Sequence, residues 1–116
     1  MVIKVKDLPK CPIEISIKML GCKWRVQIVR ELLNGTMRFC ELKKAVKGIT
    51  QKVLISKLRE MEDLGLLIRK DYNEASPKVE YTLTDIGYSL NTILGAYSSW
   101  GKDYKKYLRL LEKRNS

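Results

Sequence analysis

The sequence predicts a single α+β domain that is mostly helical, with several short helices, then a pair of strands, then one long helix. Three observations predict this class. Apolar residues recur at helical spacing over most of the chain, they alternate with polar residues only near the middle, and glycine marks most of the breaks. A length of 116 residues with 45% hydrophobic residues suits one domain, residues 1–116, with a true core.

The first third of the chain carries the signals of two short helices. Pro12 suits the first turn of a helix because its missing N–H needs no partner there, and Gly21 ends the apolar stripe that follows. A second stripe covers residues 23–33 and stops at Asn34-Gly35, a pair that favours left-handed backbone. We expect this second helix to lie mainly in the core.

Two further helices are separated by a tight turn. After an extended link at Met37 and Arg38, an apolar stripe covers residues 39–46 and Gly48 closes it. Thr50 can cap the next helix, because its hydroxyl can accept a backbone N–H from the first turn. Two short helices joined by a glycine-containing turn have the spacing of a helix-turn-helix.

The second of these helices, expected over Thr50–Leu64, has two faces. Leu54, Leu58 and Met61, with Val53 beside them, point at the core. On the other face Gln and Arg can hydrogen-bond base edges, Lys and Ser can hold phosphates, and Ile can touch a thymine methyl. An ordinary solvated face is the alternative. The candidate DNA-binding residues of this region are Arg38, Thr50, Gln51, Lys52, Ile55, Ser56 and Arg59, and the acids expected to lie outside the DNA groove are Glu60, Glu62 and Asp63.

The net charge of +10 is concentrated in the same region. Between residues 38 and 59 the chain has seven basic residues and one acid, Glu41. Such a concentration favours an anionic partner, with a merely solvated basic surface as the alternative.

Two strands are expected after Gly65, which ends the helix. Residues 66–72 and 79–83 flank loop-forming residues at 73–77 and read as a β-hairpin. A helix-turn-helix followed by such a hairpin is a winged helix, here over residues 39–83. Basic side chains near the hairpin tip could reach the DNA backbone or minor groove, or could instead pair within the sheet. These candidate DNA-binding residues are Arg69, Lys70 and Lys78.

The last helix is expected over residues 84–112, with Thr84 as its N-cap. Its apolar stripe, which includes four aromatic residues, is too long for so small a core. An isologous homodimer that packs it against the helix after Pro12 is the simplest way to bury it, and a monomer folded back at Gly95 or Gly101 is the alternative. Two reading helices about one duplex turn apart, roughly 34 Å, would read a pseudo-palindrome.

A series of short motifs runs along nearly the whole chain: Cys11-Pro12-Ile13, Gly21-Cys22-Lys23-Trp24, Arg38-Phe39 with Glu41-Leu42, Gly48-Ile49-Thr50-Gln51-Lys52-Val53-Leu54, Leu58-Arg59-Glu60-Met61-Glu62, Gly65-Leu66, Pro77-Lys78-Val79-Glu80-Tyr81 with Leu83-Thr84, Gly87, and Ser99-Trp100-Gly101. Together they resemble the HxlR-type winged-helix regulators of bacteria and archaea, relatives of the MarR group. The resemblance implies a homodimer, a recognition helix at Thr50–Leu64, a wing around Pro77, and promoters as targets, usually near the regulator's own gene.

The three cysteines, Cys11, Cys22 and Cys40, lack CxxC spacing, so neither a disulfide framework nor a zinc site is expected. The resemblance implies that Cys11 matches a thiol that senses oxidants or electrophiles in some members. A position at a helix N-terminus could also raise its reactivity, and an incidental thiol is the alternative. We expect Cys22 and Cys40 to be packing residues.

The chain has no histidine, which removes Ser-His and Cys-His activation, and it has no phosphate-binding glycine loop. We therefore expect no enzyme, cofactor or metal. No apolar run approaches the roughly 20 residues that span a bilayer, and the N-terminus lacks the core of a secretory signal, so a cytoplasmic location without membrane contact is expected.

The expected function is a DNA-binding transcriptional regulator that acts on double-stranded DNA as a homodimer. A small-molecule or oxidant effector is its further expected partner. A winged helix used as an RNA-binding or protein-docking module is the alternative, and it would show no base preference in duplex DNA.

Overall fold

The computed structural model describes residues 3–72 and 78–115. The elements follow one another along these residues in an order close to the expected one: a 3₁₀ turn at Val5–Asp7, α1 Pro12–Leu20, α2 Lys23–Leu32, β1 Met37–Arg38, α3 Phe39–Ala45, α4 Gln51–Asp63, β2 Leu67–Asp71, β3 Val79–Leu83, α5 Asp85–Tyr88 and α6 Asn91–Arg114.

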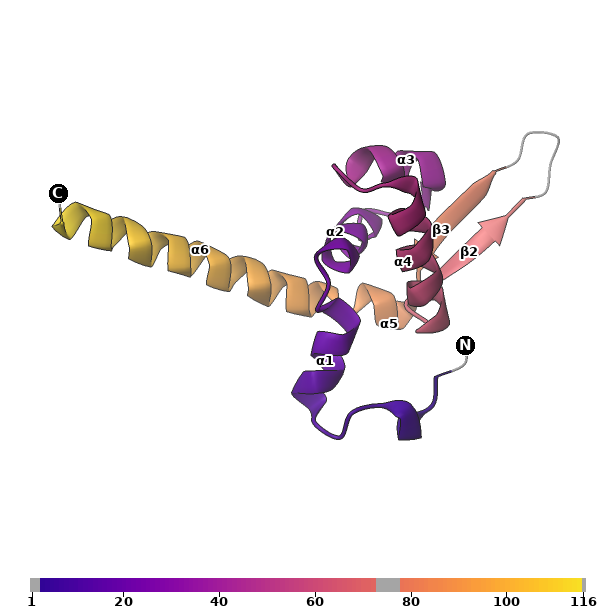
Figure 1. Cartoon of the computed structure of the whole chain (residues 1–116), viewed down its shortest axis with the longest axis horizontal. Helices are drawn as coiled ribbons and strands as arrows, with labels where there is room; N and C mark the ends of the chain where they lie inside the picture. The colour runs from indigo at the N-terminus through magenta and orange to yellow at the C-terminus, as the bar shows by residue number, and fades with distance from the viewer. Residues whose placement is uncertain (1–2, 73–77, 116) are drawn as a thin grey trace.

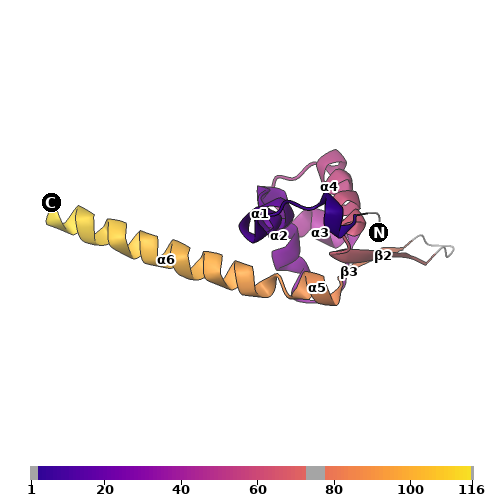
Figure 2. The same ribbon diagram turned by 90° about the horizontal axis from the view of Figure 1, so that it is seen from below.

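Helices α2, α3 and α4 gather around the small sheet, while α6 leaves this group and projects alone to one side (Figures 1 and 2). The principal extents are 63 × 37 × 23 Å, and the longest follows α6. The mostly helical α+β class predicted from the sequence is therefore confirmed. Within the part of the chain that the structure describes, no helix has the length and apolar content needed to cross a membrane.

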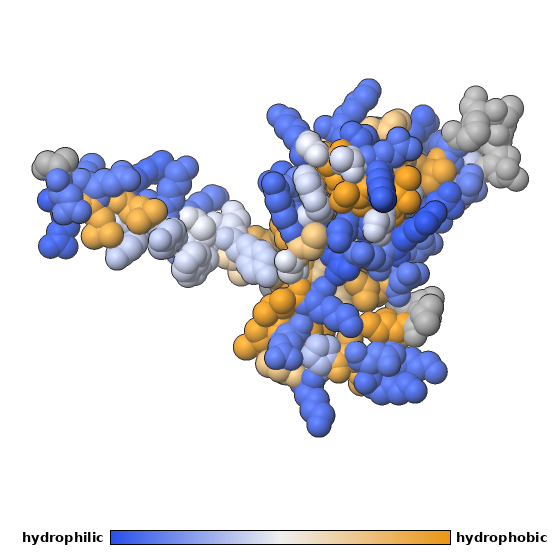
Figure 3. All heavy atoms as spheres, in the orientation of Figure 1, coloured by the Kyte–Doolittle hydropathy of each residue, from blue (hydrophilic) through white to orange (hydrophobic). Residues whose placement is uncertain are grey.

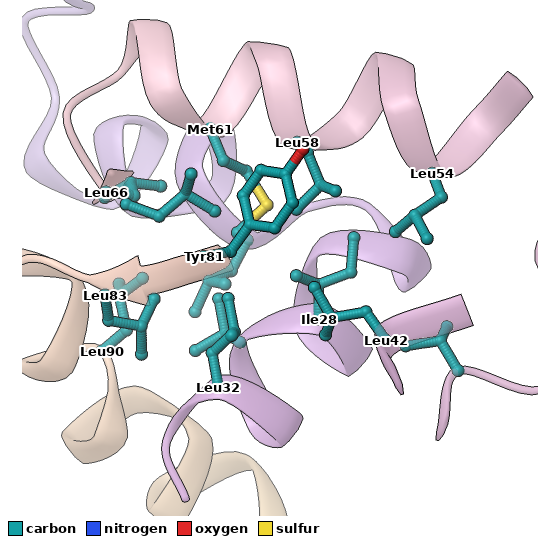
Figure 4. Packing of buried hydrophobic residues seen from close by; sticks show 14 of the residues in the cluster. Ile28, Leu32, Leu42, Leu54, Leu58, Met61, Leu66, Tyr81, Leu83 and Leu90 are labelled. Carbon is teal, nitrogen blue, oxygen red and sulfur yellow. The ribbon is translucent and has the colours of Figure 1, made fainter. Parts of the chain in front are cut away.

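The core lies between α4, α2 and β3. The apolar face of α4 points Leu54, Leu58 and Met61 at Ile28 of α2 and at Tyr81 of β3 (Figure 4). The three α4 side chains are at most 1% exposed, as their helical spacing predicts. Burial of each such side chain contributes about 1.5–3 kcal/mol, so the core fixes which face of α4 remains outside.

The sheet has three antiparallel strands in the order β1-β3-β2. The predicted hairpin is confirmed as β2 and β3, with Leu67 opposite Leu83 and Arg69 opposite Tyr81. The predicted extended link is in fact an edge strand, β1, which places Arg38 opposite Glu80. The loop expected at residues 73–77 lies outside the described residues.

Two of the predicted glycine breaks have the backbone that makes glycine necessary. Gly48 in the turn before α4 has φ of 85°, and Gly65 after α4 has φ of 76°. A side chain is disfavoured in this left-handed region. The turn before α4 and the end of α4 are therefore both determined by a glycine whose position is visible in the sequence.

The single helix expected over residues 84–112 was wrong, because the chain forms α5 and α6 with a turn at Ser89 and Leu90. At the break two hydrogen bonds of the tighter i+3 type replace the helical pattern, from Leu90 N to Gly87 O and from Thr92 N to Ser89 O. The turn lets Leu90 reach the core. Beyond it α6 continues through Gly95 and Gly101 without a break, so the folded-back alternative is also excluded.

Candidate nucleic-acid interface

Helix α4 begins as the sequence predicts. Thr50 is its N-cap, and the Thr50 hydroxyl accepts a hydrogen bond from the Val53 N–H at 3.2 Å. This satisfies one of the backbone donors that a helix leaves free in its first turn. The Thr50 hydroxyl oxygen is thus used as an acceptor inside the protein, and only its O–H is left to offer a phosphate.

The outer face of α4 carries the side chains predicted to contact DNA. Gln51, Lys52, Ser56 and Arg59 are exposed, and Ile55 is half-buried. The same residues surround an open depression that follows the helix. The first nine residues of α4 therefore present amide, ammonium, hydroxyl and guanidinium groups together above the buried leucines.

A concave surface of about 600 Å³ lies between α4 and the hairpin. It joins three predicted residues of α4, namely Gln51, Ile55 and Arg59, to Arg69 of β2. Its apolar side was not predicted and comes from Phe39, Val79 and Tyr81. Strand alternation could have suggested Val79 and Tyr81, but only the packing of α4 on the sheet brings them beside the reading face.

The basic residues of the hairpin are held by neighbours within it. Arg69 forms an ion pair with Asp71 at 3.5 Å, and the Lys78 ammonium lies 2.8 Å from Glu80. Lys70 and Lys78 both stand over the Tyr72 ring, at 4.7 Å from its centroid. Pairing within the sheet is therefore a real part of their role.

The Lys78 hydrogen bond and charge hold the pKa of the Glu80 carboxyl below its usual value, against the opposing effect of burial. The Tyr72 hydroxyl also donates to Glu80, and Arg38 adds a favourable charge. Arg38 is exposed, and its backbone N–H donates to Glu41 at the start of α3. The hairpin and β1 thus form one charged cluster.

The three acids at the end of α4 are placed differently from one another. Glu62 lines the concave surface beside Arg59 and Arg69, so it is closer to the candidate interface than its position in the chain suggested. Asp63 borders the open depression on the outer face of α4. Glu60 also borders this depression, but its carboxylate is bound by Arg25 of α2 at 2.8 Å.

The cysteines occupy three different environments. Cys11 is exposed and immediately precedes Pro12, the first residue of α1. Cys40 is exposed as well, so the packing role expected for it was wrong; it lies on the side of α3 away from the buried Leu42. Among the described residues no group of three or more Cys, Asp or Glu side chains is placed to hold a metal ion.

Cys22 is half-buried before α2 and has a lowered pKa. Burial raises the pKa of this thiol, but backbone hydrogen bonds from Arg25 and Trp24 lower it, as do the positive charges of Lys57 and Arg25, and together they prevail. A lowered pKa increases the fraction of Cys22 that is thiolate at a given pH. The packing role expected for Cys22 does not explain this shift.

The apolar face of α6 is uncovered in the single chain. Trp100 and Tyr104 stack with their ring centroids 5.4 Å apart, and Tyr107 lies 6.1 Å beyond Tyr104. All three rings are exposed, as are Ile13 and Ile17 of α1. Apolar atoms also gather over α1 and near the far end of α6 in Figure 3. A monomer rarely leaves so much apolar surface in water.

A helix-turn-helix whose second helix is anchored by leucines, flanked by a basic hairpin and followed by a long helix, defines a winged-helix transcriptional regulator. The chain belongs to the HxlR-like helix-turn-helix family, whose model matches residues 19–108. This confirms the resemblance read from the sequence motifs. The family consists of transcriptional regulators, which confirms that the chain is not an enzyme.

Individual relatives agree with this assignment. The chain is 45% identical to YkvN, an HTH-type transcriptional regulator of Bacillus subtilis, over 94 residues that cover 81% of this chain and 80% of YkvN. A MarR-family regulator from Porphyromonas gingivalis is similar in structure, with a TM-score of 0.77 and 33% identity over 86% of this chain and 97% of that one. The redox regulator HypR in its reduced form gives a TM-score of 0.78 and 33% identity, covering 85% and 98% of the two chains.

Proposed function

We propose that the protein is a homodimer that binds a pseudo-palindromic promoter site sequence-specifically, with α4 as the reading helix. The single observation that carries the proposal is the outer face of α4, where Gln51 and Arg59 are exposed over buried Leu54 and Leu58. Bidentate side chains on a rigidly anchored helix are suited to base edges in the major groove. Lys52 and Ser56 would hold phosphates on either side, and Ile55 would meet a thymine methyl.

The remaining predicted residues supply the flanks of this interface. Arg69, Lys70 and Lys78 would place the hairpin over the neighbouring backbone or minor groove, after exchanging their present carboxylate or ring contacts for phosphate. Arg38 and Thr50 would contact the backbone beside the start of α4. Such contacts set the orientation of the protein but carry no base preference.

The homodimer part of the proposal is supported by the uncovered apolar faces of α6 and α1. An isologous contact would bury Trp100, Tyr104 and Tyr107 of each chain together with Ile13 and Ile17. The two α4 helices would then be related by a two-fold axis, which is why the site should be an inverted repeat.

Selection of preferred duplexes from a random pool tests the proposal. We expect an inverted repeat with half-sites about one duplex turn apart, roughly 34 Å, and an affinity that falls steeply with salt. Equal retention of all duplexes would contradict sequence-specific reading and favour an RNA-binding or protein-docking module. Recovery of a single unrepeated half-site would contradict the dimer.

We also propose that the regulator responds to oxidants or electrophiles through Cys11. The support is its exposed thiol at the start of α1, the helix assigned to the dimer, together with the similarity to a redox regulator. Modification at this position would alter the contact between protomers and so the spacing of the two reading helices. The substitution Cys11→Ser, which exchanges one sulfur for oxygen, tests it.

A further inference from the structure

Arg25 joins two helices that have different tasks in the proposed dimer. Its side chain leaves α2 and is only 15% exposed. One terminal nitrogen, Nη1, donates to the Lys18 carbonyl of α1 at 2.6 Å, and the other, Nη2, donates to the Glu60 carboxylate of α4 at 2.8 Å. A single guanidinium therefore connects the last turn of α1 to the last turn of α4.

The chemistry of both contacts suits arginine better than any other side chain. The Lys18 carbonyl lies in the last turn of α1, where helix geometry provides no partner for it. A planar guanidinium can donate to this carbonyl and to a carboxylate at the same time, and the charged donor strengthens both bonds. Its Nε is buried and makes no hydrogen bond to the part of the chain that the structure describes, so the two terminal nitrogens fix its orientation.

Glu60 is well placed to receive this contact. The Arg25 hydrogen bond lowers the pKa of the Glu60 carboxyl, and the charge of Lys57, 3.4 Å away on the same helix, also lowers it, while burial acts in the opposite direction. The carboxylate is thus charged at neutral pH. Lys57 lies on α4 itself, so among these contacts only Arg25 ties α4 to another helix.

The position of this contact in the molecule gives it a consequence for DNA binding. Helix α1 presents Ile13 and Ile17 to the proposed dimer contact, and α4 presents Gln51 and Arg59 to DNA. Rotation of α4 relative to α1 would change the distance between the two reading helices of a dimer.

We infer that Arg25 is a positioning residue that fixes α4 against α1 and thereby sets the half-site separation the dimer accepts. The inference rests on the proposed function. It concerns a specificity determinant that touches neither DNA nor the partner subunit.

The test compares wild type with Arg25→Met, which keeps an unbranched side chain about as long as the arginine stem up to Nε and removes both hydrogen bonds. Affinity is measured for the selected inverted repeat, for versions with one base pair added or removed between the half-sites, and for one isolated half-site. We expect Arg25→Met to lose roughly tenfold in affinity for the selected separation and to discriminate poorly among the three separations. Its affinity for the isolated half-site should stay within about twofold of wild type, a difference within the usual error of additivity.

Arg30→Met is the matched control, because Arg30 is exposed on the same helix and its loss removes the same charge. It should keep the separation preference. Thermal unfolding of each variant establishes that it is folded at the temperature of the assay. Glu60→Gln breaks the same ion pair from the other side and replaces Arg25→Met if that variant does not fold.

The outcomes separate this inference from the proposed function. A wild-type separation profile for a folded Arg25→Met or Glu60→Gln overturns the role of Arg25 and leaves the reading function intact. Equal losses at the isolated half-site and at the full site overturn it as well, because the residue would then support only α4 itself. Failure of wild type to prefer any duplex overturns the proposed function instead.

Discussion

Cys11 and Cys22 both precede a helix, yet the structure surrounds them differently. Cys22 accepts backbone hydrogen bonds from Trp24 and Arg25 and lies near two positive charges, which lower its pKa although burial raises it. Cys11 precedes Pro12, a residue without a backbone N–H to donate, and its thiol is exposed. A lower pKa increases the thiolate fraction at a given pH, whereas exposure decides which reagents can reach the sulfur.

At the residue scale, we predict that Cys11→Ser abolishes the proposed response to an electrophile. Treated wild type should bind the selected duplex roughly tenfold more weakly than untreated protein, the usual size of coupling between two sites, and treated Cys11→Ser should not change. Duplex titration before and after treatment measures this. If Cys22→Ser alone removed the response, the sensor would be the half-buried thiol instead.

Residue roles were predictable where they depend on near neighbours in the chain. The caps at Thr50 and Thr84 involve an N–H three residues further on, so the residue type and the spacing were enough to find them. The Arg25–Glu60 pair joins positions 35 residues apart, and nothing in either local sequence marks the other as its partner. The exposure of Cys40 also depends on how α3 packs.

Helix α4 differs from its neighbour α3 in what it can present to DNA. The outer face of α4 combines groups able to recognise bases with groups able to hold phosphate, and it borders the concave surface shared with Arg69. Helix α3 offers exposed ammonium groups at Lys43 and Lys44. A compact ammonium acts as a point charge, so α3 should add affinity without base preference.

At the element scale, Arg59→Ala and Lys43→Ala should therefore have different effects. Arg59→Ala is expected to relax base preference at one position of each half-site, at a cost of about 1–3 kcal/mol for the preferred base. Lys43→Ala should weaken all duplexes alike and reduce the salt slope by about 1. Titrations against the selected duplex and its single-base variants distinguish the two. Uniform weakening by Arg59→Ala would mean that Arg59 holds phosphate rather than reading a base.

The same scale shows where periodicity stops being informative. Periodicity and glycine positions predicted α1 to α4 and the hairpin, because each has its own apolar pattern and its own end signal. The pattern of α5 continues into α6 in phase, so the turn at Ser89 and Leu90 could not be seen in it. A two-residue strand such as β1 has no period at all, and it is defined only by its pairing with β3.

For the whole molecule, the main feature is that α6 projects from the compact group formed by the other helices and the sheet, with no other element packed along most of its length. Helix α6 has 24 residues, none of them buried, and its aromatic residues share one side. Basic residues such as Lys102 and Lys106 lie on the opposite side, because neighbouring positions on a helix are about 100° apart. This division is the one expected of a helix whose aromatic side is covered by a second copy.

At the scale of the whole molecule, Tyr104→Glu should convert the proposed dimer into a monomer. Tyr104 lies at the centre of the aromatic row, between Trp100 and Tyr107, so a carboxylate there would be buried without a partner in the dimer. Sedimentation velocity should show roughly half the mass of wild type, as closed two-fold symmetry requires. Lys106→Glu, which introduces the same group on the other side of α6, should remain dimeric. A monomeric Lys106→Glu would place the contact on that side.

Helix α6 joins the rest of the molecule at the turn formed by Ser89 and Leu90, so a small change of angle at this turn moves the far end of α6 by a large distance. A helix of 24 residues is about 36 Å long, so a rotation of about 10° at its base displaces its far end by roughly 6 Å. This exceeds the rise of roughly 3.4 Å per base pair along the axis of the duplex. Gly87 lies in α5, just before this turn. Its backbone is so close to the Leu66 carbonyl that a methyl group at this position would collide with the carbonyl oxygen. In the proposed dimer, small substitutions around this contact would change the direction of α6 and with it the separation of the two reading helices.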